Sequence, residues 1–75
     1  MKPFRVFCRT WWRETSDAVW PNGLEPYWSQ RLYLSESFAN EDQARNLCQI
    51  LNGQPRTAEQ ERLGFKYEYT NKAML

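Results

Sequence analysis

Residues 40–53 contain the only strongly amphipathic helical stretch of the sequence, and this stretch constrains the fold most. Its apolar side chains follow the i, i+3, i+4, i+7 spacing of one helix face, and they are Ala44, Leu47, Cys48 and Leu51. Asn40 is a suitable N-cap with Gln43 at the capping-box position, and Asn52-Gly53 is typical of a left-handed helix end. We therefore expect one main helix that turns a single face to a core.

Three other segments alternate apolar and polar residues with the period of two that is typical of a strand, and they are residues 4–12, 30–38 and 65–70. The first two are expected to pair as antiparallel neighbours. The third segment is preceded by residues 58–63, for which two structures are possible. They form either a short helix, capped by Thr57 and closed by Gly64, or a mobile loop. The sequence thus predicts a small α+β fold, a single domain over residues 1–75. It has a three-stranded antiparallel sheet in the order β-β-α-β, with the main helix packed on one face.

The expected core lies between the helix and one face of the sheet. Its residues are Phe4, Val6, Cys8, Leu32, Leu34, Leu47, Cys48, Leu51 and one face of the third strand. The alternation also places Thr10 and Trp12 on this face of the first strand.

The other face of the first strand interleaves guanidinium groups with aromatic rings, and its residues are Arg5, Phe7, Arg9, Trp11 and Arg13. With the helix on the far side, this set lies on the open side of the sheet. One interpretation is a recognition surface, because Trp and Arg dominate interface hot spots and also stack on bases. The other is that the arginines pack over the rings as cation–π pairs and only solubilise the face.

Residues 14–29 are rich in turn residues and are expected to form a long connection. Trp20, Leu24, Tyr27 and Trp28 make it too apolar for a solvated tether. Two interpretations stand. The aromatic residues fold back and plug the open side of the sheet, or they form a rigid projection that docks in a partner's groove. On the second interpretation Trp20, Tyr27 and Trp28 belong to the binding surface.

Residue types needed for most catalysis are missing. The chain has no histidine, its three glycines are isolated, and its two cysteines, Cys8 and Cys48, are forty positions apart. A general base of the commonest kind, a phosphate-binding glycine loop and a four-ligand zinc site are therefore not expected. We expect neither enzyme activity nor a metal nor a cofactor.

Charge and hydropathy further limit the expected partners and cellular location. The formal net charge of +1 argues against a dedicated non-specific nucleic-acid binder, which usually carries a large positive excess. The sequence contains no run of about eighteen apolar residues, so no membrane span is expected. Two free thiols suit a reducing compartment, which predicts a cytoplasmic protein.

Three segments together resemble a group of short phage and prophage proteins of unassigned function: residues 8–13, residues 20–26, and residues 41–48 with Asn52. The likeness spans residues 4–53. Such accessory proteins are often inhibitors of host defence, including anti-CRISPR proteins, which bind and block a host complex. The resemblance therefore implies a host protein or ribonucleoprotein complex as partner, in the bacterial cytoplasm.

Two functional hypotheses follow. The leading one is a non-enzymatic, anti-CRISPR-like inhibitor that acts by protein–protein contact through the residues Arg5, Phe7, Arg9, Trp11, Arg13, Trp20, Tyr27 and Trp28. The alternative is a small RNA or single-stranded DNA binding module that uses the same sheet face. Both a monomer and a homodimer built through the exposed third strand are compatible with the pattern.

Overall fold

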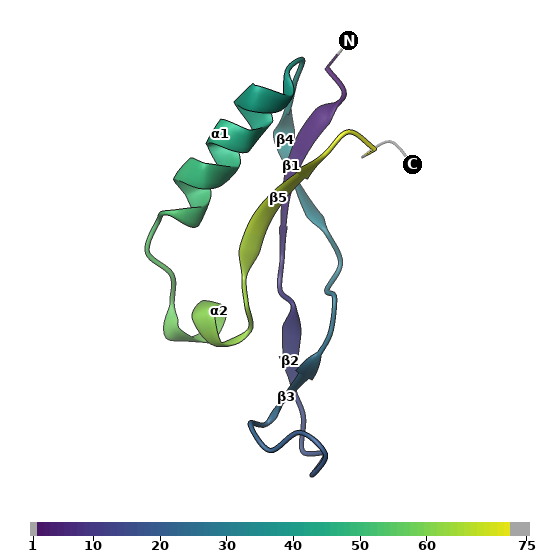
Figure 1. The fold of residues 1–75 in the computed structure, drawn as a ribbon, viewed down its shortest axis with the longest axis vertical. Helices are drawn as coiled ribbons and strands as arrows, with labels where there is room; N and C mark the ends of the chain where they lie inside the picture. Colours follow the sequence, from purple (N-terminus) through teal and green to yellow (C-terminus); the bar gives the residue numbers. More distant parts are fainter. Residues whose placement is uncertain (1, 73–75) are drawn as a thin grey trace.

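The computed structural model describes residues 2–72. Along the chain it contains β1 (Phe4–Arg9), β2 (Trp12–Glu14), β3 (Leu24–Pro26), β4 (Leu32–Phe38), α1 (Glu41–Asn52), α2 (Ala58–Arg62) and β5 (Lys66–Thr70). The molecule is long and flat, with principal extents of 48 × 29 × 16 Å. Figure 1 shows α1 beside the sheet formed by β4, β1 and β5, and the β2–β3 hairpin at the far end of the long axis.

The main sheet has the order β4-β1-β5, and both neighbours run antiparallel to β1. Helix α1 packs on one face of this sheet, which confirms the predicted small α+β fold. Val6 and Ala44 are fully buried between the two layers, together with Cys48. The half-buried residues around them are Phe4, Leu34, Phe38, Leu47, Leu51, Tyr67 and Tyr69. The predicted core is therefore correct except for Cys8 and Leu32, which do not belong to this cluster; Cys8 is only half-buried.

Leu32 was assigned to the core, but it is 63% exposed. Leu32 lies on β4, an edge strand of the sheet, opposite Cys8 of β1. Helix α1 lies more over β1 and β5 than over β4. The assignment was wrong because the alternation identifies a face of a strand, whereas the position of the helix decides which part of that face is covered.

The first strand is shorter than the predicted segment 4–12. It breaks after Arg9, where the backbone N–H groups of Trp11 and Trp12 both donate to the Leu63 carbonyl, at 3.0 and 3.1 Å. Successive N–H groups of a regular strand point in opposite directions, so two neighbours cannot share one acceptor without a break. Beyond the break Trp12 is 40% exposed, and its predicted place on the core-facing side is wrong.

The predicted long connection, residues 14–29, contains β3, which forms a second, two-stranded sheet with β2 at its start. In it β2 pairs antiparallel with β3, with Trp12 opposite Pro26 and Glu14 opposite Leu24. The hairpin extends the long axis of the molecule away from α1 and does not cover the open side of the main sheet (Figure 1). The hairpin therefore projects from the main sheet, and its docking in a partner's groove stays a prediction.

A bulge in β4 sets the register of the main sheet. Arg5 lies opposite Ser37 and Phe7 opposite Tyr33, so two steps along β1 correspond to four along β4. The Arg5 guanidinium donates a hydrogen bond of 2.6 Å to the carbonyl of Leu34, which lies within the bulge. Arg5 therefore satisfies a backbone acceptor that the interrupted ladder leaves free.

The helix ends differ in part from expectation. Asn40 occupies the N-cap of α1, but its side chain makes no capping hydrogen bond. Gly53 has a φ of −83°, so the predicted left-handed end is wrong, and its N–H bonds back to α1 carbonyls instead. The predicted short helix is present as α2, with a reciprocal capping box between Thr57 and Gln60.

Candidate binding surface

The face of the main sheet that is turned away from α1 carries cations and aromatic rings. Residues directly opposite one another on antiparallel strands share a face, so the register defines its members. We call this surface the open face, and its residues are Arg5, Phe7, Arg9, Arg31, Tyr33, Ser37, Lys66, Glu68 and Thr70. It contains three of the predicted binding residues.

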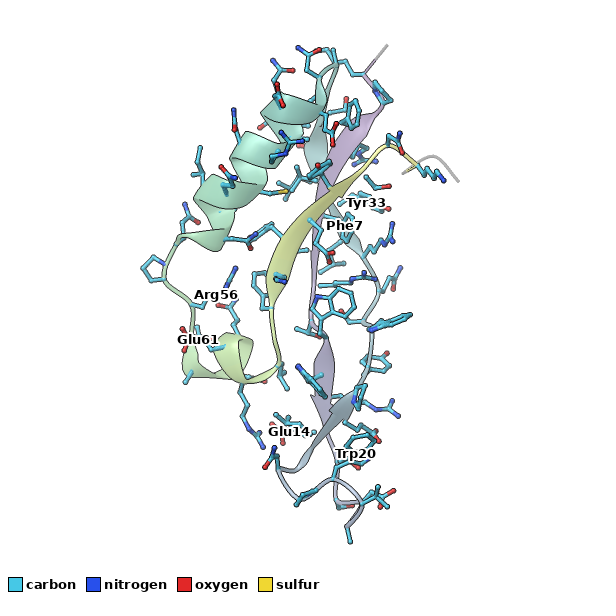
Figure 2. The ribbon with its side chains drawn as sticks, in the orientation of Figure 1. Phe7, Glu14, Trp20, Tyr33, Arg56 and Glu61 are labelled. Carbon is cyan, nitrogen blue, oxygen red and sulfur yellow. The ribbon has the colours of Figure 1, made fainter. Side chains whose placement is uncertain are left out.

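Phe7 lies at the centre of the open face but is only 2% exposed. The guanidinium carbons of Arg31 and Arg9 lie 4.4 and 5.5 Å from its ring centroid. The Tyr33 ring packs against it at 5.4 Å, and Figure 2 shows the two rings side by side on neighbouring strands. Phe7 therefore packs beneath the exposed groups of the open face, and its ring is not available to a partner.

Arg9 is held from two directions. Its guanidinium lies 4.2 Å from the Trp11 ring and forms an ion pair of 3.2 Å with Glu68, and its side chain is 13% exposed. Arg5 lies over the Tyr33 ring at 4.9 Å in addition to its bond to the Leu34 carbonyl. Both arginines thus have structural partners within the chain.

Arg31 was not among the predicted binding residues, yet it is a cation of the open face. It is exposed, lies over Phe7, and donates a 3.3 Å hydrogen bond to the Tyr33 hydroxyl. It forms no ion pair within residues 2–72. The alternation of residues 30–38 already places Arg31 and Tyr33 on one side of their strand, and this was the signal that would have identified it.

The charge of the open face is unbalanced. It carries Arg5, Arg9, Arg31 and Lys66, whereas Glu68 is the only acidic residue at the positions that pair with β1. The carboxylates of Glu41 and Asp42 lie on α1, where both pair with Arg45. The open face therefore carries an excess of positive charge, although the chain as a whole is nearly neutral.

Exposed aromatic residues continue the surface toward the hairpin. The Trp28 ring packs edge-on against Trp11 at 5.8 Å and is 69% exposed. Farther along, Arg13 lies over the Tyr27 ring at 4.7 Å and pairs with Glu25. Trp28 and Tyr27 thus extend the Arg–aromatic stacking of the open face onto the hairpin.

Trp20 does not join this series. It lies in the hairpin tip (Figure 2), where it lines a separate apolar cleft of about 310 Å³ with Trp12, Pro21 and Leu24. The predicted binding residues therefore fall into two groups. Seven of them follow the open face and its extension, and Trp20 lies elsewhere.

The chemistry of the remaining groups is limited. No cluster of three or more His, Cys, Asp or Glu side chains that would hold a metal ion occurs within residues 2–72. Cys8 and Cys48 are free thiols, and burial raises the pKa of each above its ordinary value of 9.0, so both are protonated at neutral pH. Over the same range, no helix has the length and apolar character required to cross a bilayer.

In comparisons with known proteins, the chain matches no family model, no curated protein sequence and no solved structure. The fold and the surface together define a small α+β protein with a cationic, aromatic sheet face. Functional inference rests on that surface.

Proposed function

We propose that the chain is a non-enzymatic binding protein that docks its open face and the adjoining hairpin aromatics on an acidic surface of a partner protein. The observation that carries the proposal is Arg31, an exposed guanidinium that lies over Phe7, donates to the Tyr33 hydroxyl and has no ion-pair partner among residues 2–72. Arginine in such a stacked position loses little further entropy when it binds a carboxylate.

The aromatic part of the surface favours a protein partner over single-stranded nucleic acid. Sheet-based RNA readers stack bases on aromatic rings exposed at the centre of the sheet. Here the central ring, Phe7, is 2% exposed beneath two guanidinium groups. The exposed Trp28 and Tyr27 lie at the margin, where they suit the anchoring role that aromatic residues take in protein interfaces.

The resemblance to short phage and prophage proteins supports a narrower form of the proposal. On that basis the partner is a host defence complex, and the chain is an anti-CRISPR-like inhibitor that acts in the bacterial cytoplasm. Two free thiols, a buried one at Cys48 and a half-buried one at Cys8, are compatible with a reducing compartment.

Pairing through β5 is disfavoured as the route to a homodimer. The side-chain amide of Asn52 occupies both outward backbone groups of Tyr67 on this edge strand. A second copy would have to displace these bonds before it could add a strand there. We therefore propose a monomer that binds its partner through the open face.

The test is affinity capture from a bacterial lysate, together with titration of the purified chain against a mixed-sequence single-stranded RNA. We expect specific protein capture that Arg31→Gln abolishes and Arg45→Gln preserves, because Arg45 carries the same charge on α1. RNA binding that weakens steeply with salt, without charge-dependent protein capture, would favour the nucleic-acid alternative and overturn the proposal.

A further inference from the structure

A cleft of about 570 Å³ lies beside the break between β1 and β2, on the side of α2. Three aromatic rings, those of Trp11, Trp12 and Phe65, form its apolar walls, and Arg56, Glu61 and Lys66 supply its charges. Figure 2 places Arg56 and Glu61 on the α2 side of β5. Trp11 and Lys66 also belong to the surface described above, whereas Trp12, Arg56, Glu61, Gly64 and Phe65 do not.

Gly64 shapes this cleft. Its φ is +70°, and a Cβ atom built on it would lie 2.9 Å from Cδ1 of Trp12. The backbone therefore approaches the indole more closely than any side chain would allow. Together with the Leu63 carbonyl, which binds the N–H groups of Trp11 and Trp12, this contact fixes the aromatic wall.

Two hydrogen-bond donors in the wall have no acceptor within residues 2–72. They are Nε1 of Trp11 and Nε of Arg56, and both are buried. Arg56 is otherwise well held, since its Nη2 donates to Asn52 at 2.7 Å and its guanidinium carbon lies 5.7 Å from the Phe65 centroid. Buried polar groups are paired in the great majority of cases, so two unpaired donors beside one cleft indicate a missing acceptor.

The charged side chains around the cleft also lack ion-pair partners. Arg56, Lys66 and Glu61 form no ion pair within the part of the chain that the structure describes. Two cations, Arg56 and Lys66, together with the spare N–H of Trp11 favour an anionic group, whereas the Glu61 carboxylate favours a donor such as an exocyclic amine. The three rings favour a flat group between them.

We propose that this cleft binds a flat heteroaromatic ring that carries an anionic group, the chemistry of a nucleoside monophosphate. Arg56 and Lys66 bind the phosphate, the rings of Trp11 and Phe65 pack on the base, and Glu61 accepts from its amino group. Neither unpaired nitrogen is exposed, so binding includes a small rotation of the Trp11 and Arg56 side chains toward the cleft. The volume lies within the range of about 300–1,000 Å³ that is usual for small-ligand sites.

The test follows the indole N–H signals of the four tryptophans by ¹H–¹⁵N NMR during titration with cytidine 5′-monophosphate. We expect a saturable shift of the Trp11 signal, which Trp11→Phe assigns by removing it. Cytidine and inorganic phosphate should each bind at least about tenfold more weakly, because each offers only part of the ligand. No movement of the Trp11 signal up to about 10 mM nucleotide, where even a millimolar site is occupied, overturns the proposal.

Two variants add a second criterion. Arg56→Gln keeps a side chain that can bond to Asn52 but removes the charge, and it should weaken nucleotide binding about tenfold. Trp20→Phe and Arg45→Gln, both outside the cleft, should bind as the parent does. Parent-like affinity in Arg56→Gln overturns the proposal, even if Trp11→Phe fails to fold.

The source of the ligand is distinguished by comparing the free nucleotide with a 5′-phosphorylated oligocytidine. Tighter binding of the oligonucleotide identifies a strand end, and equal binding identifies a free nucleotide; both support the site. These measurements need no partner protein. Failure of the cleft to bind would therefore leave the proposed function intact, and failure of protein capture would leave the cleft intact.

Discussion

The side-chain amide of Asn52 pairs with both backbone polar groups of Tyr67, accepting from its N–H at 2.9 Å and donating to its carbonyl at 3.0 Å. Asn52, the last residue of α1, thus makes the two hydrogen bonds to β5 that the backbone of a neighbouring strand would make. The contact joins helix to sheet and blocks an edge that would otherwise be free to pair.

Asn52→Ala should lower the free energy of unfolding by about 1–3 kcal/mol, because it leaves partly buried backbone groups of Tyr67 without partners. Urea denaturation measures this loss, and size-exclusion chromatography shows whether the opened edge leads to association. Asn46→Ala, at an exposed position of α1, is the control and should change stability by less than about 0.5 kcal/mol. Equal denaturation midpoints for the two variants would contradict the role of Asn52.

Gly64→Ala should destabilise the fold by about 1–3 kcal/mol, because φ is +70° and the added Cβ meets Trp12 at 2.9 Å. Gly53→Ala is the matched control, since its φ is −83° and the nearest atoms lie at ordinary distances of 3.4 and 3.5 Å. That substitution should be neutral or slightly stabilising. Thermal melts of both variants test the difference, and a loss at Gly53 equal to that at Gly64 would contradict it.

Leu47→Ala should cost about 2 kcal/mol, the lower end of the range for leucine truncation, because Leu47 is packed against the core but only half-buried. Ile50→Ala on the same helix removes a similar side chain that is 63% exposed, and we expect little change. Both are measured by urea denaturation. Similar losses would mean that α1 does not present the Leu47 side to the sheet.

Alkaline pH should destabilise the protein through its thiols. Burial raises the folded-state pKa of Cys8 and Cys48 above 9.0, so the folded chain favours the protonated thiol. This contribution is fully present below pH 9 and is lost as pH rises through the folded-state pKa values. Melting temperature measured across this range should fall less steeply for the Cys8→Ala/Cys48→Ala variant than for the parent. Parallel curves would show that the thiols make no such contribution.

Local patterns in the sequence were sufficient for the two helices, the three strands of the main sheet and the layer order, but not for the β2–β3 hairpin. The spacing of Ala44, Leu47, Cys48 and Leu51 identified α1, and the Thr57 cap indicated α2 as one of two alternatives for its segment. Alternation placed Val6 in the core. Each of these features depends on residues within a few positions of one another, where backbone geometry dictates the side-chain direction.

Features that depend on distant residues were not predictable in this way. The break after Arg9 requires the carbonyl of Leu63, more than fifty positions later. The burial of Phe7 requires Arg31, whose guanidinium covers a ring on the neighbouring strand. Asn52 was assigned to the helix end, and its bonds to Tyr67 became visible only once β5 was placed beside α1.

The same long-range contacts explain why Arg31 is a better test of the binding surface than Arg9 and Trp11, two of the residues that the sequence predicted for it. Arg9 is paired with Glu68, and Trp11 packs against Arg9 and Trp28, so removing the two together would disturb the fold. Arg31 is exposed and forms no ion pair among the described residues, so its charge can be removed with little structural effect.

The most direct test of the proposed binding surface is the affinity of the captured partner for Arg31→Gln and Arg45→Gln, measured by isothermal titration calorimetry alongside melting temperatures. We predict that Arg31→Gln raises Kd about tenfold or more, as expected for an arginine that loses a carboxylate partner, with an unchanged melting temperature. Arg45→Gln should match the parent in Kd. Equal affinities for the parent and Arg31→Gln would contradict the claim that the open face binds the partner.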